Sequence, residues 1–230
     1  MPQTANPRVP VATEVHKIIK SQIVSLQLMP GQLLMVQQLA KDMGVSRTPI
    51  REALVILCDE GLVAEADGRK FRVSDITWKL IDDIYMARKV VEMVAVEHVT
   101  QNAASIDGII ELDKLVEKME AYCKDDSFTE YLEADRLFHA TLVELLGNQV
   151  ITGWMSRIQD QQQRIRYLTT GVSSRIGRSC REHAAILKAI RSANVALAKS
   201  EMENHLDRAY KDVIEFKNNS FSRAANLIRD

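Results

Sequence analysis

The chain has 230 residues, of which 46% are hydrophobic and 27% charged, and this composition excludes disordered, collagen-like and low-complexity proteins. Its 30 Lys and Arg residues against 31 Asp and Glu residues give a formal net charge of −1, so the overall charge does not point to nucleic acid. No stretch approaches the ~18 apolar residues needed to cross a bilayer, and the first ten residues lack a signal peptide's apolar core. We therefore expect a cytoplasmic protein with no membrane partner and, from its length, two domains.

The cysteine pattern agrees with a reducing compartment. Cys58, Cys123 and Cys180 are an odd number and are widely spaced, which excludes a disulfide framework and a C-x-x-C site. We expect each of them to be a small buried hydrophobic residue.

The elements predicted before residue 75 follow the order helix, short strand, helix, tight turn, helix, hairpin. Their expected ranges are 12–26, 32–34, 36–43, 47–60, 62–66 and 69–73. Gly44 supplies the left-handed residue that ends the second helix, and Ser46 is a suitable N-cap for the third. Two helices joined by a short glycine turn and followed by a hairpin predict a winged helix-turn-helix.

The remainder of the chain is predicted to be helical. No proline occurs after position 49, and helical periodicity indicates six further helices. Their expected ranges are 76–101, 106–124, 128–146, 149–169, 178–191 and 194–218. The predicted architecture is mainly α: an arm over 1–10, a winged helix-turn-helix over 11–75, and an all-α bundle of six to seven helices over 76–230.

The third predicted helix opens with residues suited to DNA. Arg47 and Arg51 are four residues apart and project from one face, where each could make a bidentate contact with guanine in the major groove. The hydroxyls of Ser46 and Thr48 suit phosphate oxygens. The alternative is a solvated helix start with Arg51 paired to a carboxylate.

Four polar residues occupy positions on the apolar stripes of three predicted helices in the second part. The stripe residues are Asp135 and His139 in 128–146, His183 in 176–190, and His205 in 195–216. A buried carboxylate or imidazole costs several kcal/mol unless it is paired, so the four are best explained if they meet. Three imidazoles and one carboxylate suit a divalent transition metal such as Zn, Ni, Mn, Co or Fe. The alternative is a set of separate structural core residues.

The first part contains three motifs in order: Leu28-Met-Pro-Gly-Gln-Leu-Leu, then Gln38-Leu-Ala-Lys-Asp-Met-Gly-Val-Ser-Arg-Thr-Pro-Ile-Arg-Glu-Ala-Leu, then Glu60-Gly-Leu-Val. Together they resemble the GntR family of bacterial transcription regulators. The helical remainder is similar to the fatty-acid-regulator (FadR) branch, whose C-terminal effector module is the FCD domain.

This resemblance implies roles for individual residues. It makes Arg47 and Arg51 the base readers, Ser46 and Thr48 phosphate contacts, and Gly68 the tip of a wing in the minor groove. Gln37 stands where relatives often carry a DNA-contacting arginine.

In the helical part, Asp135, His139, the Glu182-His183 pair and His205 match the metal-binding subset of FCD domains. Arg88 resembles an arginine that faces the effector pocket, although an i,i+4 solvated ion pair with Glu92 explains it equally well.

These observations favour a ligand-responsive transcription regulator that binds a palindromic operator as a homodimer, and we expect it to be a repressor. Its helical domain is expected to bind the metal and a small carboxylate effector. One alternative is a metal-dependent enzyme fused to a DNA-binding domain, against which the absence of a second acidic ligand or a Glu-x-x-His pair argues. Another is a direct metal sensor without an organic effector.

Overall fold

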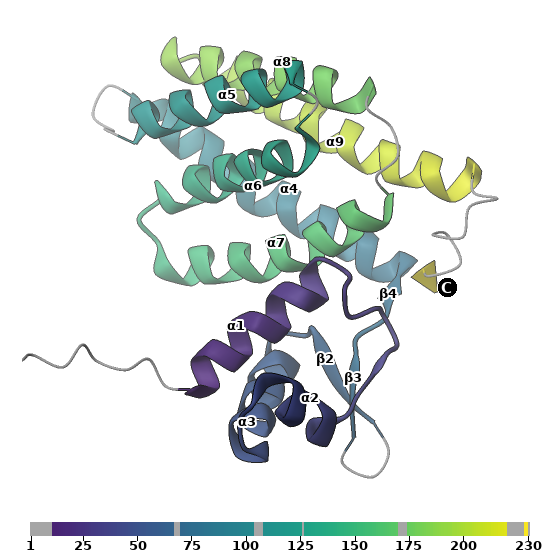
Figure 1. The fold of residues 1–230 in the computed structure, drawn as a ribbon. Helices are drawn as coiled ribbons and strands as arrows, with labels where there is room; N and C mark the ends of the chain where they lie inside the picture. The colour runs from purple at the N-terminus through teal and green to yellow at the C-terminus, as the bar shows by residue number, and fades with distance from the viewer. Residues whose placement is uncertain are drawn as a thin grey trace, which may run out of the picture. The chain divides into compact units, whose positions relative to one another are not determined.

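A computed structural model describes residues 11–66, 70–103, 108–125, 127–169, 174–219 and 228–229 (Figure 1). The predicted arm over 1–10 and the predicted wing tip Gly68 lie outside these residues. The chain divides into two compact units. The first comprises residues up to Trp78 together with 163–168 and the C-terminal strand, and the second comprises 79–162 and the residues from Thr169 to the last helix.

The first unit is a small helical domain with a three-stranded sheet. Its elements are α1 (Val11–Val24), β1 (Leu33–Leu34), α2 (Val36–Met43), α3 (Arg47–Asp59), β2 (Val63–Ala66), β3 (Lys70–Val73) and β4 (Ile76–Thr77). The strand order is β1-β3-β2, all antiparallel, with Ala66 opposite Lys70 at the end of the hairpin. This arrangement confirms the predicted winged helix-turn-helix.

A shared apolar core holds α1, α3 and the sheet together. Ile19 of α1, Leu54 of α3 and Phe71 of β3 belong to one buried cluster. The turn between α2 and α3 depends on Gly44, whose φ of 65° lies in the left-handed region, and its N–H donates to the carbonyls at the end of α2. The turn therefore fixes where α3 begins, and the core fixes which face of α3 stays outside.

A buried arginine also belongs to the first unit. Arg164 lies in the part of α7 assigned to this unit, is fully buried, and donates from Nη2 to the carbonyl of Ser74. Burial lowers the pKa of Arg164 to about 10, against an opposing contribution from Asp75. This contact is not apparent from the sequence, because it joins residues 90 positions apart.

The second unit is all-helical. Its helices are α4 (Trp78–Gln101, from residue 79 on), α5 (Ile109–Lys124), α6 (Phe128–Glu144), α7 (Gln149–Thr169, except 163–168), α8 (Ser174–Arg191) and α9 (Val195–Asn219). In Figure 1, α5 lies beside both α6 and α8, and these pairs, like α8 with α9, are in close contact. Met119, Phe138, Ile186 and Met202 are among its buried apolar residues, so the core lies between the amphipathic faces of these helices.

The structure corrects several predicted boundaries, and α1, for example, ends at Val24 rather than 26. α4 begins at Trp78 rather than 76, because Ile76 and Thr77 form β4, which pairs in parallel with β5 (Ile228–Arg229). α8 begins at Ser174, whereas 171–177 was expected to be a loop. The loop was expected because glycine in a helix interior is about 1 kcal/mol less favourable than alanine. Gly177 nevertheless lies within α8. α6 ends at Glu144 instead of 146.

No helix among the described residues is long and apolar enough to cross a membrane.

The left-handed backbone of Gly44 makes the turn between α2 and α3 sensitive to substitution. Neither Gly44 nor Gly153 has an atom within 4 Å of the position that an added Cβ would take, but only Gly44 has a positive φ. Gly44→Ala should lower the free energy of unfolding by about 1–2 kcal/mol through backbone strain. Gly153→Ala, in the interior of α7, should raise it by about 0.5–1 kcal/mol. Urea unfolding measures both, and equal effects of the two substitutions would contradict the assigned turn conformation.

Candidate functional site

The four predicted metal ligands meet inside the second unit. Asp135 and His139 lie one turn apart on α6, His183 lies on α8 and His205 on α9. All four side chains are buried, with at most 3% of any residue exposed. Each offers one ligand atom, and these atoms all lie within 4.8 Å of one another. The structure thus brings together the stripe residues that the sequence singled out.

Three imidazole Nε2 atoms converge at the centre of this cluster. His139 Nε2 lies 3.2 Å from His183 Nε2 and 3.3 Å from His205 Nε2. The Asp135 carboxylate lies 3.6 Å from His183 Nε2 and 3.9 Å from His139 Nε2. Atoms bound to one ion at 2.0–2.2 Å are about 3–3.5 Å apart. His139 Nε2 has this spacing from each of the other two Nε2 atoms, and the carboxylate lies slightly further out.

The other nitrogen of each ring faces an acceptor. His183 Nδ1 lies 2.8 Å from the carbonyl of Ser179, and His205 Nδ1 lies 2.9 Å from Glu182 Oε2. His139 Nδ1 lies 2.5 Å from Glu92 Oε2. The acceptors at His183 and His205 place a proton on Nδ1 of these rings, and the close Glu92 carboxylate favours the same tautomer for His139. Three Nε2 lone pairs then point at one another in a buried space, an arrangement that a cation would stabilise.

The electrostatics of the cluster keep two of the rings neutral. Burial lowers the pKa of His139, with a further contribution from Arg88, and lowers that of His183 well below its ordinary value, assisted by the neighbouring imidazoles. Burial opposes ionisation of Glu92, but Arg88 and His139 outweigh it and lower the Glu92 pKa to about 2. Neutral imidazoles and ionised carboxylates are the forms that bind metals.

Arg88 lies behind the cluster and is linked to it through Glu92. Its Nε donates to Glu92 Oε1 at 2.7 Å, so the expected i,i+4 pair exists. It is not solvated, because both side chains are at most 1% exposed, and Arg88 Nη2 is buried without a hydrogen-bond partner among the residues that the structure describes. Glu92 is a further residue of the site, not expected there from the sequence. Its spacing from Arg88 on the buried stripe of α4 was the available signal.

Glu182 is the second carboxylate behind the ligands. It contacts His205 through Oε2 and accepts from Arg208 Nη1 at 2.9 Å through Oε1. Burial works against its ionisation, but the bonds to His205 and Arg208 lower its pKa overall. Two of the three imidazoles therefore have an ionised carboxylate at Nδ1, and each of these carboxylates is paired with an arginine.

The residues expected to contact DNA lie at the start of α3. Ser46 is the N-cap residue, and its side chain makes no capping hydrogen bond. Ser46, Arg47, Thr48 and Arg51 are all exposed. Neither arginine forms an ion pair with any residue that the structure describes, so the pairing of Arg51 with a carboxylate, the alternative expected from the sequence, does not occur there. Gln37 on α2 is also exposed.

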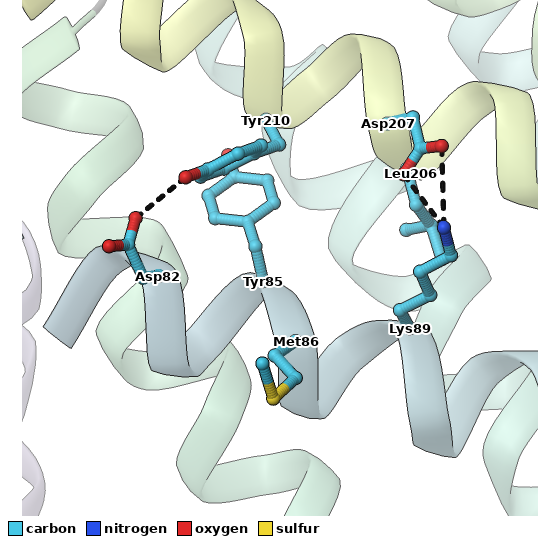
Figure 2. Close-up of a pocket in the computed structure, with 7 residues that line it drawn as sticks. All are labelled: Asp82, Tyr85, Met86, Lys89, Leu206, Asp207 and Tyr210. Atoms are coloured by element: carbon cyan, nitrogen blue, oxygen red, sulfur yellow. Dashed lines mark hydrogen bonds and ion pairs between the residues drawn. The ribbon is translucent and has the colours of Figure 1, made fainter. Parts of the chain in front are cut away.

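A pocket of about 270 Å³ lies between α4 and α9 in the second unit (Figure 2). The Tyr210 hydroxyl donates to Asp82 at 2.7 Å, and Lys89 Nζ donates to Asp207 at 3.0 Å. The rings of Tyr85 and Tyr210 lie 5.3 Å apart. These charged and hydroxyl groups are paired with one another, in contrast to the converging lone pairs of the imidazole cluster.

Two protein families match the chain, each over a different part of the sequence. The family described as bacterial regulatory proteins, gntR family, matches residues 11–73, and the FCD domain family matches residues 83–208. The second match contains all four ligand residues, and the first contains the start of α3.

Individual proteins give the same result. An uncharacterized HTH-type transcriptional regulator, YdhC of Bacillus subtilis, is 29% identical over 198 residues, or 86% of this chain and 88% of its own. The HTH-type transcriptional repressor RspR of Escherichia coli is 22% identical over 92% of both chains. The solved structure of E. coli McbR/YncC has a TM-score of 0.77 and 20% identity, covering 90% of this chain and 98% of that one. Together with the helix-turn-helix and the helical bundle, these matches show that the chain belongs to the GntR family of bacterial transcription regulators and carries an FCD domain.

Proposed function

We propose that this GntR-family regulator is a homodimeric, FadR-branch repressor whose helical domain binds one divalent transition metal and a small carboxylate effector. DNA reading is assigned to residues 11–75, and effector binding and dimerisation to 76–230. The observation that carries the proposal is the convergence of three buried Nε2 atoms beside Asp135. Repression is supported by RspR, a relative named as a repressor.

The donor set fits a metal such as Zn, Ni, Mn, Co or Fe. Asp135, His139, His183 and His205 would hold the ion, while Glu92, Glu182 and the Ser179 carbonyl would orient the rings. Four protein ligands leave positions for water or ligand oxygens when the ion is five- or six-coordinate. A bound divalent ion supplies local positive charge that attracts a carboxylate.

Arg88 supports a carboxylate as the effector. Its buried Nη2 lacks a hydrogen-bond partner, and an unpaired buried donor costs about 1–3 kcal/mol. A carboxylate oxygen would satisfy it. Because Arg88 also holds Glu92, which contacts His139, the arginine would couple effector binding to the orientation of a metal ligand.

The metal prediction is tested by His205→Ala. This variant should lose its metal and its effector response but keep specific DNA binding, because α3 lies in the other unit. Glu182→Gln, which weakens the acceptor at His205 Nδ1, should lower metal affinity about 10–100-fold. Elemental analysis, metal titration and gel-shift assays with an organic-acid series measure these effects.

His98→Ala is the matched control. His98 is exposed on α4 and should not affect metal content. Metal-free wild-type protein, purified without chelator and still fully responsive to an organic acid, would contradict the proposal. DNA release on metal addition alone, with no response to any acid, would favour the direct metal sensor.

The start of α3 supports base reading by two arginines. Arg47 and Arg51 are exposed on one face, have no ion pair among the described residues, and follow a helix N-terminus whose free N–H groups suit phosphate. We expect α3 in the major groove and Ser46 and Thr48 at the backbone, with Gly68 assigned to the wing by resemblance alone.

Arg47→Ala and Arg51→Ala should each weaken operator binding by about 1–3 kcal/mol and relax base preference at one position. The fold should be unchanged, because both side chains are exposed. The operator is first selected from a random DNA pool, and each variant is then titrated against it and its single-base changes. Lys118→Ala removes an exposed positive charge on α5 and serves as the control. Unchanged affinity and base preference in both arginine variants would exclude base reading by these residues.

An exposed apolar stripe on α4 supports a homodimer. Met86, Val90 and Val94 are 70%, 64% and 52% exposed and recur every four residues, so they share one face. Met86 also lines the pocket of Figure 2. Apolar side chains gathered on one helix face are typical of an interface, and a twofold dimer matches a palindromic operator.

Val90→Glu should break the dimer, because two copies of the charge would be buried at a twofold interface. Light scattering at micromolar concentration should give a mass near the 26.0 kDa of one chain, against twice that value for the wild type. Ile110→Glu, which places the same charge on a similarly exposed residue of α5, should leave the dimer intact. A wild-type monomer with and without DNA would refute the dimer, and a dimer of Val90→Glu would refute this interface.

A further inference from the structure

Two of the three cysteines lie at the contact between α5 and α8. Cys123 is in the last turn of α5, and Cys180 is in the second turn of α8. Only Cys180 is fully buried, whereas Cys123 and Cys58 are partly exposed, contrary to the expectation that all three would be buried. Cys58 lies on α3 in the other unit. The pair at the α5–α8 contact is therefore separate from the third thiol.

The sulfur of each cysteine lies against the helix that carries the other cysteine. The Cys180 thiol donates to the carbonyl of Met119 at 3.4 Å. That carbonyl is four residues before Cys123, so it belongs to the same helical turn. Conversely, Cys123 Sγ lies 3.8 Å from the position of a Cβ on Gly177, one turn before Cys180. These two contacts place both sulfurs at the same point of the α5–α8 contact.

The two thiols differ in their readiness to react. Burial, with a smaller contribution from the neighbouring Cys123 thiol, raises the pKa of Cys180 to about 12, so this thiol stays protonated at neutral pH. Cys123 is partly exposed and can be reached by a small molecule. Since the thiolate is the nucleophile and access limits exchange, Cys123 is the residue that would react first.

We propose that Cys123 and Cys180 form a reversible intramolecular disulfide when the protein meets a small-molecule disulfide. The Cys123 thiolate attacks one sulfur of the small disulfide, forms a mixed disulfide, and releases one small thiolate. Cys180 then loses its proton and attacks the Cys123 sulfur, which releases the second small thiolate. The protein loses two electrons and two protons, and the small disulfide is reduced to two thiols.

The bond would join α5 to the part of α8 that carries a candidate metal ligand. Cys180 precedes His183 by three residues, so both side chains lie on the same side of α8. Disulfides in reducing compartments are mostly transient and redox-sensing. The disulfide itself does not depend on the proposed metal, and its test requires none.

The test uses reduced full-length protein and oxidised glutathione as the probe. Native protein is incubated with excess probe, remaining thiols are alkylated, and the unreduced chain is digested with trypsin. Cleavage at Lys and Arg places Cys123 in residues 119–124 and Cys180 in residues 179–181. Mass spectrometry should find these two peptides linked, and free thiols should fall from three to one per chain. Dithiothreitol should restore all three.

Single variants separate the steps. Cys58→Ser should still lose two thiols. Cys180→Ser should retain a mixed glutathione disulfide on Cys123, because the resolving thiol is gone. Cys123→Ser should leave the buried Cys180 unreacted. A stable mixed disulfide on Cys123 of the wild type, a link to Cys58, or no reaction at Cys123 would each overturn the proposal.

Discussion

Three imidazoles that turn their unprotonated nitrogens toward one another inside a helical domain are the feature on which the candidate site depends. Neutral lone pairs 3.2–3.3 Å apart in a buried space gain nothing from one another. The surrounding contacts nevertheless impose this orientation, because Glu92, Glu182 and the Ser179 carbonyl hold the opposite side of each ring. Among the described residues that form the cluster, Asp135 adds a negative charge to the same space. A cation at the centre would bind the three Nε2 lone pairs and the Asp135 carboxylate.

The charges around the cluster form successive layers. Imidazoles lie at the centre, carboxylates contact two of them, and Arg88 and Arg208 neutralise those carboxylates from outside. This order keeps Glu92 and Glu182 ionised despite burial. The arginine on α4, matched to the effector pocket by resemblance, is therefore also part of the support for His139. Effector binding and ligand orientation would then share one side chain.

The sequence predicted the ligands and much of the fold because both follow from helical periodicity. Asp135, His139, His183 and His205 interrupt apolar stripes, and α2 and α7 have the predicted bounds. Contacts between distant segments were missed. Glu92 faces His139 only after α4 packs on α6, the Ser179 acceptor is a backbone atom, and β4 pairs with β5 across 152 positions (Ile76 with Ile228). The first turn of α8 was missed because local propensity opposes Gly177.

X-ray absorption spectroscopy of the metal-loaded protein tests the central claim most directly, since it reports the atoms bound to the ion. We expect a nitrogen and oxygen shell at about 2.0–2.2 Å with multiple scattering from three imidazoles. The His205→Ala variant, loaded with excess metal, should show scattering from at most two imidazoles. A shell of water oxygens without imidazole scattering, or one containing sulfur, would contradict the assignment of the ion to Asp135, His139, His183 and His205.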